Sequence, residues 1–160
     1  METSEISSPE TTKEFAHNLF RELHQAILQH EAGVLSGNVE SVHDMRVGIR
    51  RLRVALNNFA VCLRKKERRL WRSRLENLAQ ALGGVRDLDV MIEALKARAI
   101  IRPEPDRRAI LAFVSRLRAR RRRALLRLKT YLASQEFAEF KLGFPAIPNL
   151  SHPHQKESTQ

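Results

Sequence analysis

Apolar residues recur every three or four positions along most of this chain, which is the spacing of an amphipathic helix. Glycine, proline and short polar turns interrupt that pattern. We therefore expect helices over residues 10–35, 39–63, 67–82, 85–101, 106–132 and 135–142. No stretch alternates with the period of two that marks a β-strand. The sequence predicts an all-α fold, a helical bundle of about five helices and a short last one, running up and down in antiparallel order.

These helices are expected to form one domain over residues 10–142. Residues 1–9 are small and polar and predict a disordered N-terminus, while the proline-rich residues 143–160 predict a loose C-terminal tail. Gly83-Gly84 is expected to end the third helix, since glycine favours the turn that closes a helix. Asp87 and Asp89 would then lie in the first turn of the next helix, where a carboxylate is favourable.

The helix that starts near Val39 carries two adjacent stripes of side chains. The stripe that should pack into the core consists of Met45, Ile49, Leu52, Leu56 and Phe59. The polar stripe lies within an arc of roughly 80° and consists of His43, Arg46, Arg50, Arg53 and Asn57. Val47 and Val54 flank the polar stripe on its other side. A solvated face is not normally bounded by apolar residues on both edges, so we expect these arginines to line a groove or channel wall that requires an anion.

The net charge also favours an anionic partner. The chain has 29 Lys and Arg against 18 Asp and Glu, a formal charge of +11, which points to a polyanion. Most of the positive charge is arginine, whose planar fork of donors suits phosphate oxygens. The expected helix over residues 106–132 adds a second basic stripe, consisting of Arg116, Arg120, Arg123 and Arg127. Arg121 instead falls in the apolar seam of that helix and should meet an acid, an anion or a subunit boundary.

The sequence gives little support for a catalytic or metal site. His17, His24 and His30 lack the register with a carboxylate that a metal site needs, so we interpret them as structural. Phosphoryl transfer needs acidic metal ligands among the basic residues, and Asp87 and Asp89 already have a capping explanation. We therefore expect no catalytic residues, no metal and no cofactor.

Cellular location is inferred from what the chain does not contain. Cys62 is the single cysteine, which favours a reducing cytoplasm. The acidic, polar N-terminus does not look like a signal peptide, and no apolar run approaches the length of a membrane span. We expect a soluble, cytoplasmic protein without a membrane partner.

Two motifs together resemble the CHAD family, the conserved-histidine α-helical domains. They are His43-x-x-Arg46-Val47-x-x-Arg50-Arg51-Leu52-Arg53 and Leu82-Gly83-x-x-Arg86-Asp87-Leu88-Asp89-Val90. The resemblance implies an all-helical protein that binds inorganic polyphosphate through a basic cavity, with some members found on polyphosphate granules. It implies that His43, Arg46, Arg50 and Arg53 face the polyanion, and that Arg86 approaches it or braces the site with Asp87 and Asp89. Arg51 matches the motif but falls on the outer side of its helix.

The resemblance covers about one half of the usual family domain, which has two similar helical halves that each carry a basic helix. No second His-x-x-Arg-x-x-x-Arg helix follows Leu142. Either the other half is missing from this chain, or two copies pair as a homodimer and rebuild the cavity, which is the alternative we prefer. A monomer without the full cavity would bind more weakly. A two-fold interface would also cover the same exposed apolar patch on both copies.

Three other functions remain open at this stage. The net charge suits a nucleic-acid-binding protein equally well, although no aromatic residues accompany the arginines as stacking platforms. A polyphosphate or triphosphate hydrolase, or a phosphohistidine carrier through His43, would require a metal-ligand set that the sequence does not suggest. The stripes could also pair with acids on a protein partner, which would make the chain a structural scaffold.

Overall fold

The structure is a computed structural model, and it describes residues 9–143. The expectations for residues 1–8 and 144–160 lie outside the described residues. The helices are α1 (Pro9–Leu28), α2 (Glu31–Ser36), α3 (Val39–Asn58), a 3-10 helix η1 (Ala60–Cys62), α4 (Lys65–Ile100), α5 (Asp106–Leu132) and α6 (Gln135–Lys141). No strand occurs within this part of the chain, so the all-α prediction is confirmed.

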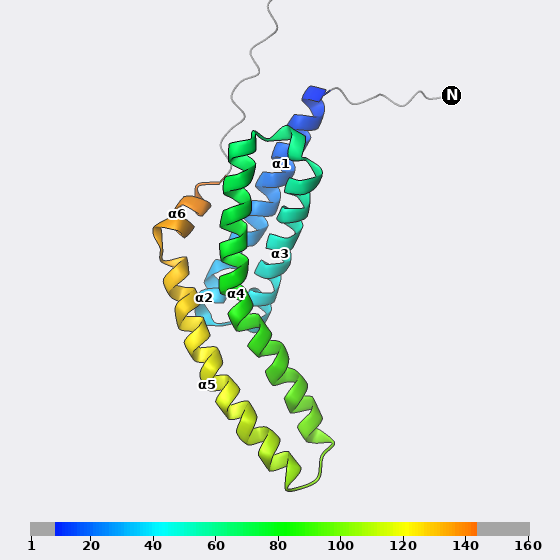
Figure 1. The fold of residues 1–160 in the computed structure, drawn as a ribbon, viewed down its shortest axis with the longest axis vertical. Coiled ribbons are helices and arrows are strands. Elements are labelled where there is room, and N and C mark those ends of the chain that lie inside the picture. Colours follow the sequence, from blue (N-terminus) through cyan, green and yellow to red (C-terminus); the bar gives the residue numbers. More distant parts are fainter. Residues whose placement is uncertain (1–8, 144–160) are drawn as a thin grey trace, which may run out of the picture.

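The long helices run in antiparallel order, as the sequence predicted (Figure 1). α1 packs on α3, α3 packs on α4, and α4 packs on α5 along the longest contact in the molecule. The second half of α4 and the first half of α5 form a hairpin that projects beyond the ends of α1 and α3 (Figure 1). The molecule is therefore a compact helical bundle with one long arm.

The expected break at Gly83-Gly84 is wrong, because α4 continues through both glycines. The buried positions before and after the pair share one register, and they are Trp71, Leu75, Leu78, Leu82, Val85 and Asp89. Burying this seam against α3 and α5 outweighs the cost of about 1 kcal/mol that a helical glycine imposes. Asp87 and Asp89 are consequently mid-helix residues, and their expected capping role is also wrong.

The first expected helix is shorter than predicted. It ends at Leu28, and a turn at Gln29-His30 separates it from α2. α2 ends at Ser36, one residue after the expected helix end, and Gly37 closes it with a φ of +81°, which suits a residue without a side chain. Asn38 then caps α3, because its side-chain Oδ1 accepts a 2.8 Å hydrogen bond from the Ser41 backbone. α3 ends at Asn58, earlier than expected, and the following residues form η1.

α6 is held against the bundle by polar contacts around an aromatic cluster. His24 Nε2 lies 2.8 Å from the backbone oxygen of Phe140, and its ring packs edge-on to Trp71. Arg74 pairs with Glu139 at 2.7 Å, and Asn77 donates to Glu136 at the same distance. His24 is thus a buried structural histidine, which agrees with its interpretation from the sequence.

The continuity of α4 gives a first testable prediction. Gly84→Ala should raise the free energy of unfolding by about 0.5–1 kcal/mol, because alanine suits a helix interior better than glycine. A Cβ atom at Gly84 would meet nothing within 4 Å. The measurement is urea denaturation followed by circular dichroism. Gly37→Ala is the control and should destabilise, because φ is positive there and its Cβ would approach Leu125 to 2.8 Å. Destabilisation by Gly84→Ala would contradict a continuous helix.

The burial of His24 predicts a dependence of stability on pH. Burial lowers the pKa of His24 from its ordinary value of 6.5, and the hydrogen bond with Phe140 opposes this only in part. The unfolded state therefore binds a proton at His24 more readily than the folded state does. This contribution to the free energy of unfolding is fully present above about pH 6.5 and is lost progressively as the pH falls below that value. Thermal unfolding between about pH 7.5 and pH 5.5 should show this fall, reduced in His24→Gln. An equal fall in both proteins would exclude His24 as its source.

Candidate functional site

The polar stripe of α3 lies along one exposed edge of the bundle. His43 is half-buried, whereas Arg46, Arg50 and Arg53 are exposed. The neighbouring apolar stripe is buried as expected, since Met45, Ile49, Leu52 and Leu56 all belong to the core and Phe59 packs partly against it. α3 therefore fixes four basic side chains on one side by burying the adjacent side.

Arg46 reaches across to α4 at the glycine pair. Its Nη1 lies 3.3 Å from Asp87 Oδ1, and it would lie equally close to a Cβ atom at Gly83. The absence of a side chain at Gly83 thus allows the guanidinium to lie against the α4 backbone. Arg86 is half-buried and follows Gly83 by three positions, so it lies on the same side of α4. The two motifs of the sequence therefore meet in space.

The second basic stripe approaches the same turn of α4 from the opposite side. Arg127 of α5 lines a groove of about 380 Å³ together with Gln80 and Gly84 of α4. The floor of this groove includes Tyr131, and burial, followed by the carboxylate of Glu136, raises the pKa of Tyr131 to about 12. Tyr131 therefore stays neutral at ordinary pH. Arg116, Arg120, Arg123 and Arg127 are all exposed.

These residues define a basic track across three helices. It consists of His43, Arg46, Arg50 and Arg53 on α3, the Gly83-Gly84 turn of α4, and Arg116, Arg120, Arg123 and Arg127 on α5. At 1.5 Å per residue, the arginines span about 10 Å on α3 and about 16 Å on α5. Arg46 and Arg127 flank the glycine turn. Arg116 belongs to the first half of α5, the half that forms the projecting hairpin (Figure 1). A flexible chain-like ligand can cross α4 at Gly83-Gly84, where the helix has no side chains.

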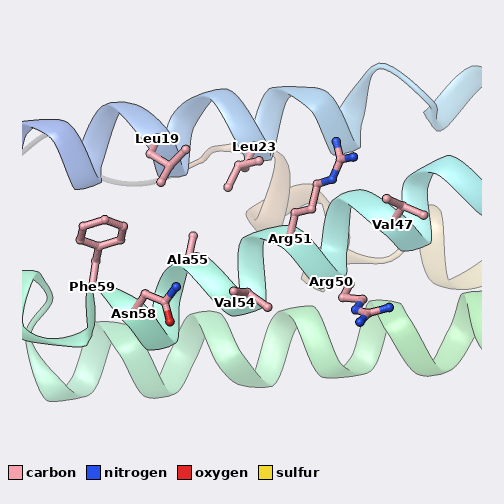
Figure 2. Close-up of a pocket in the computed structure, with 9 residues that line it drawn as sticks. All are labelled: Leu19, Leu23, Val47, Arg50, Arg51, Val54, Ala55, Asn58 and Phe59. Atoms are coloured by element: carbon pink, nitrogen blue, oxygen red, sulfur yellow. The ribbon is translucent and has the colours of Figure 1, made fainter.

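The expectation that apolar residues wall in the arginines is met only in part. Val47 is half-buried, but Val54 is 50% exposed. Both line a groove of about 490 Å³ between α1 and α3, with Arg50 and Arg51 at its edge (Figure 2). Within one chain the basic stripe of α3 therefore forms only one wall of a possible binding site, and it is open to solvent on the side of this groove.

The sequence reasoning assigned Asp89 to a helix start and did not recognise it as the buried partner of Arg121. Arg121 donates through Nε and Nη2 to the Asp89 carboxylate and through Nη2 to the backbone oxygen of Gly37, at 3.1 Å. The side chains are 4% exposed for Asp89 and 16% for Arg121. This confirms that Arg121 meets an acid. The sequence did contain a signal for the burial of Asp89, because this residue continues the helical register of Leu75, Leu78, Leu82 and Val85. The helix break expected at the glycine pair concealed that register.

The described residues offer no group of three or more His, Cys, Asp or Glu side chains placed to hold a metal ion. Over the same residues, no helix has both the length and the apolar character needed to cross a bilayer.

A family model, the CHAD domain, matches residues 18–160 of the chain. Searches against curated proteins and against solved structures gave no match.

The buried Arg121–Asp89 pair gives a prediction for stability. Asp89→Ala should lower the free energy of unfolding by about 3–5 kcal/mol, because it leaves a buried guanidinium without its counter-charge. Replacing both partners, with Asp89→Leu and Arg121→Met, should recover most of the loss. Urea denaturation measures both effects. The control is Asp87→Ala, which breaks the exposed pair with Arg46 and should cost less than about 1 kcal/mol. Similar losses at Asp87 and Asp89 would contradict this assignment.

Proposed function

The chain belongs to the CHAD domain family, and we propose that it binds inorganic polyphosphate along the basic track without breaking it down. The family is associated with polyphosphate binding. Polyphosphate is a flexible chain of closely spaced negative charges with no bases to read. Arginines in a row can hold it by charge-assisted hydrogen bonds and by release of its counterions.

One arginine from each stripe lies at the glycine pair of α4, and this is the observation that carries the proposal. Arg46 lies against Gly83 on one side and Arg127 lines the groove at Gly84 on the other, where a Cβ atom would meet nothing within 4 Å. A polyanion following the arginines of α3 can pass over this glycine pair and continue along α5. Scattered surface arginines would not present such a continuous path.

The carboxylates near the track support binding rather than catalysis. Asp87 pairs with Arg46, and Asp89 is buried against Arg121. Each of these acids therefore orders a basic residue in the structure. We propose that Arg86 of α4 is a further phosphate ligand in addition to His43 of the basic track, and that the protein works in the cytoplasm, where it could associate with polyphosphate granules.

We further propose that one chain supplies half of the binding cavity and a second copy supplies the rest. The open side of the α3 stripe supports this view, since an anion held there by one chain stays largely in water, where each charge contact is weak.

The decisive experiment replaces three arginines of α3 together. Arg46→Ala, Arg50→Ala and Arg53→Ala should weaken the binding of long-chain polyphosphate about 100-fold or more, at roughly 1 kcal/mol per lost hydrogen bond. The slope of log affinity against log salt should fall by about 2, at roughly 0.7 per lost phosphate contact. Both follow from titrations at several salt concentrations. Circular dichroism should show unchanged helicity.

The matched control removes the same charge from a different face. Arg107, Arg118 and Arg122 are exposed on α5 outside the basic track, and their replacement by alanine should leave affinity within about threefold. Equal losses in the two triple variants would mean that net charge, not the track, determines binding. Displacement of polyphosphate by duplex DNA at equal phosphate concentration would instead favour nucleic acid as the ligand.

A further inference from the structure

The two rows of residues that line the groove beside Arg127 and Gly84 continue along the projecting hairpin. On α4, the residues that follow Gly84 at helical spacing are apolar, and they are Leu88, Met91 and Leu95. On α5, the residues that precede Arg127 at the same spacing are Arg123, Arg120, Arg116 and Phe113. We call these two rows the hairpin face. Its apolar part is open to solvent, since Met91 is 45% exposed and Phe113 is 46% exposed.

The buried ion pair between Asp89 and Arg121 places the two rows of the hairpin face at one level. Because α4 and α5 are antiparallel (Figure 1), Met91 lies as far beyond Asp89 along α4 as residue 119 lies before Arg121 along α5. That level falls between Arg116 and Arg120. An occupant that lies along the hairpin face would therefore meet apolar and basic side chains together.

The helices of the hairpin place no carboxylate on this face. Residues 107–135 contain no Asp or Glu. On α4, Asp89 is buried in its ion pair, and Glu93 is two positions from both Met91 and Leu95, which puts it on the opposite side of the helix. None of the three arginines of the face forms a salt bridge with a carboxylate of the described residues. Charge complementarity therefore calls for an acidic occupant.

The apolar row distinguishes a protein from polyphosphate as that occupant. Polyphosphate has no apolar group, so Met91 and Phe113 would stay in water beside it. An amphipathic helix with apolar residues on one side and carboxylates on the adjacent side would cover the apolar row and pair with the arginines. The hairpin face and Arg127 extend over residues 113–127 of α5, about 21 Å or four helical turns. A partner helix of ordinary length is therefore long enough to cover them.

We infer that the hairpin face binds an acidic amphipathic helix of a partner protein, which lies along α4 and α5 as a third helix. The inference goes beyond polyphosphate binding, because it assigns Met91 and Phe113, which the basic track does not use. The helix shares Arg116, Arg120 and Arg123 with the track, so it competes with polyphosphate for this part of α5.

The test uses a synthetic 16-residue peptide, with leucine at helical spacing on one side and glutamate on the adjacent side. Fluorescence anisotropy should show that the parent binds it with a dissociation constant below about 100 µM. Met91→Ser together with Phe113→Ser should weaken binding about tenfold, because two apolar contacts are lost. The matched control is Val90→Ser together with Leu111→Ser. These residues are 48% and 42% exposed and lie outside the hairpin face, so affinity should stay within about twofold.

Two further probes establish that the occupant is an apolar helix and not merely an anion. A second peptide with serine in place of every leucine should bind the parent at least about tenfold more weakly. Equal binding of the two peptides would overturn the inference, since charge alone would then account for both. So would equal peptide affinity in the two double variants. Vesicles of phosphatidylglycerol and phosphatidylcholine should not bind the parent. Vesicle binding that is lost with Met91→Ser and Phe113→Ser would overturn the inference in favour of a lipid surface.

Polyphosphate titration of the same proteins separates this inference from the proposed function. The Met91→Ser and Phe113→Ser variant should bind polyphosphate within about threefold of the parent, because it keeps every arginine. Polyphosphate should also displace the peptide from the parent. A parent that binds polyphosphate but no peptide up to about 1 mM would overturn the inference alone. A parent that binds the peptide but no polyphosphate would overturn the proposed function and leave the inference standing.

Discussion

The placement of the basic residues depends on one buried ion pair. Arg121 and Asp89 join α5 to α4, and the same guanidinium donates to the Gly37 backbone at the turn before α3. Three segments that are distant in the sequence are therefore fixed at one point. A buried charge without its partner is costly, so packings that separate these groups are disfavoured. This contact therefore helps to fix the relative positions of α3, α4 and α5, together with the packing of these helices on one another.

The glycine pair connects the architecture with the site. A helix of 36 residues can tolerate two adjacent glycines when its buried seam continues on both sides of them. Because glycine has no side chain, these two positions leave a strip of α4 without side chains between Arg46 and Arg127. The same two residues thus weaken the helix slightly and add no side chains of their own over its backbone.

Because the arginines are exposed, the strength with which a single protein chain can bind phosphate groups is limited. Exposed guanidiniums interact with phosphate in water of high dielectric, where each contact contributes little. Enclosing the stripe raises the strength of every contact without adding a residue. In the structure, the groove beside Arg50 leaves this side of the stripe open.

The sequence by itself determined the helical class, the extent of α5, the core stripe of α3 and the two rows of arginines, because each follows from a local period of 3.6 residues. It could not determine that α4 continues through Gly83-Gly84, since local propensity favours a break and only packing against α3 and α5 opposes it. For the same reason Asp87 and Asp89 were assigned to a helix start instead of to Arg46 and Arg121. That one arginine of each basic row lies at the glycine pair is a property of the tertiary structure alone, because Arg46 reaches Gly83 and Arg127 reaches Gly84 only through the way the helices pack.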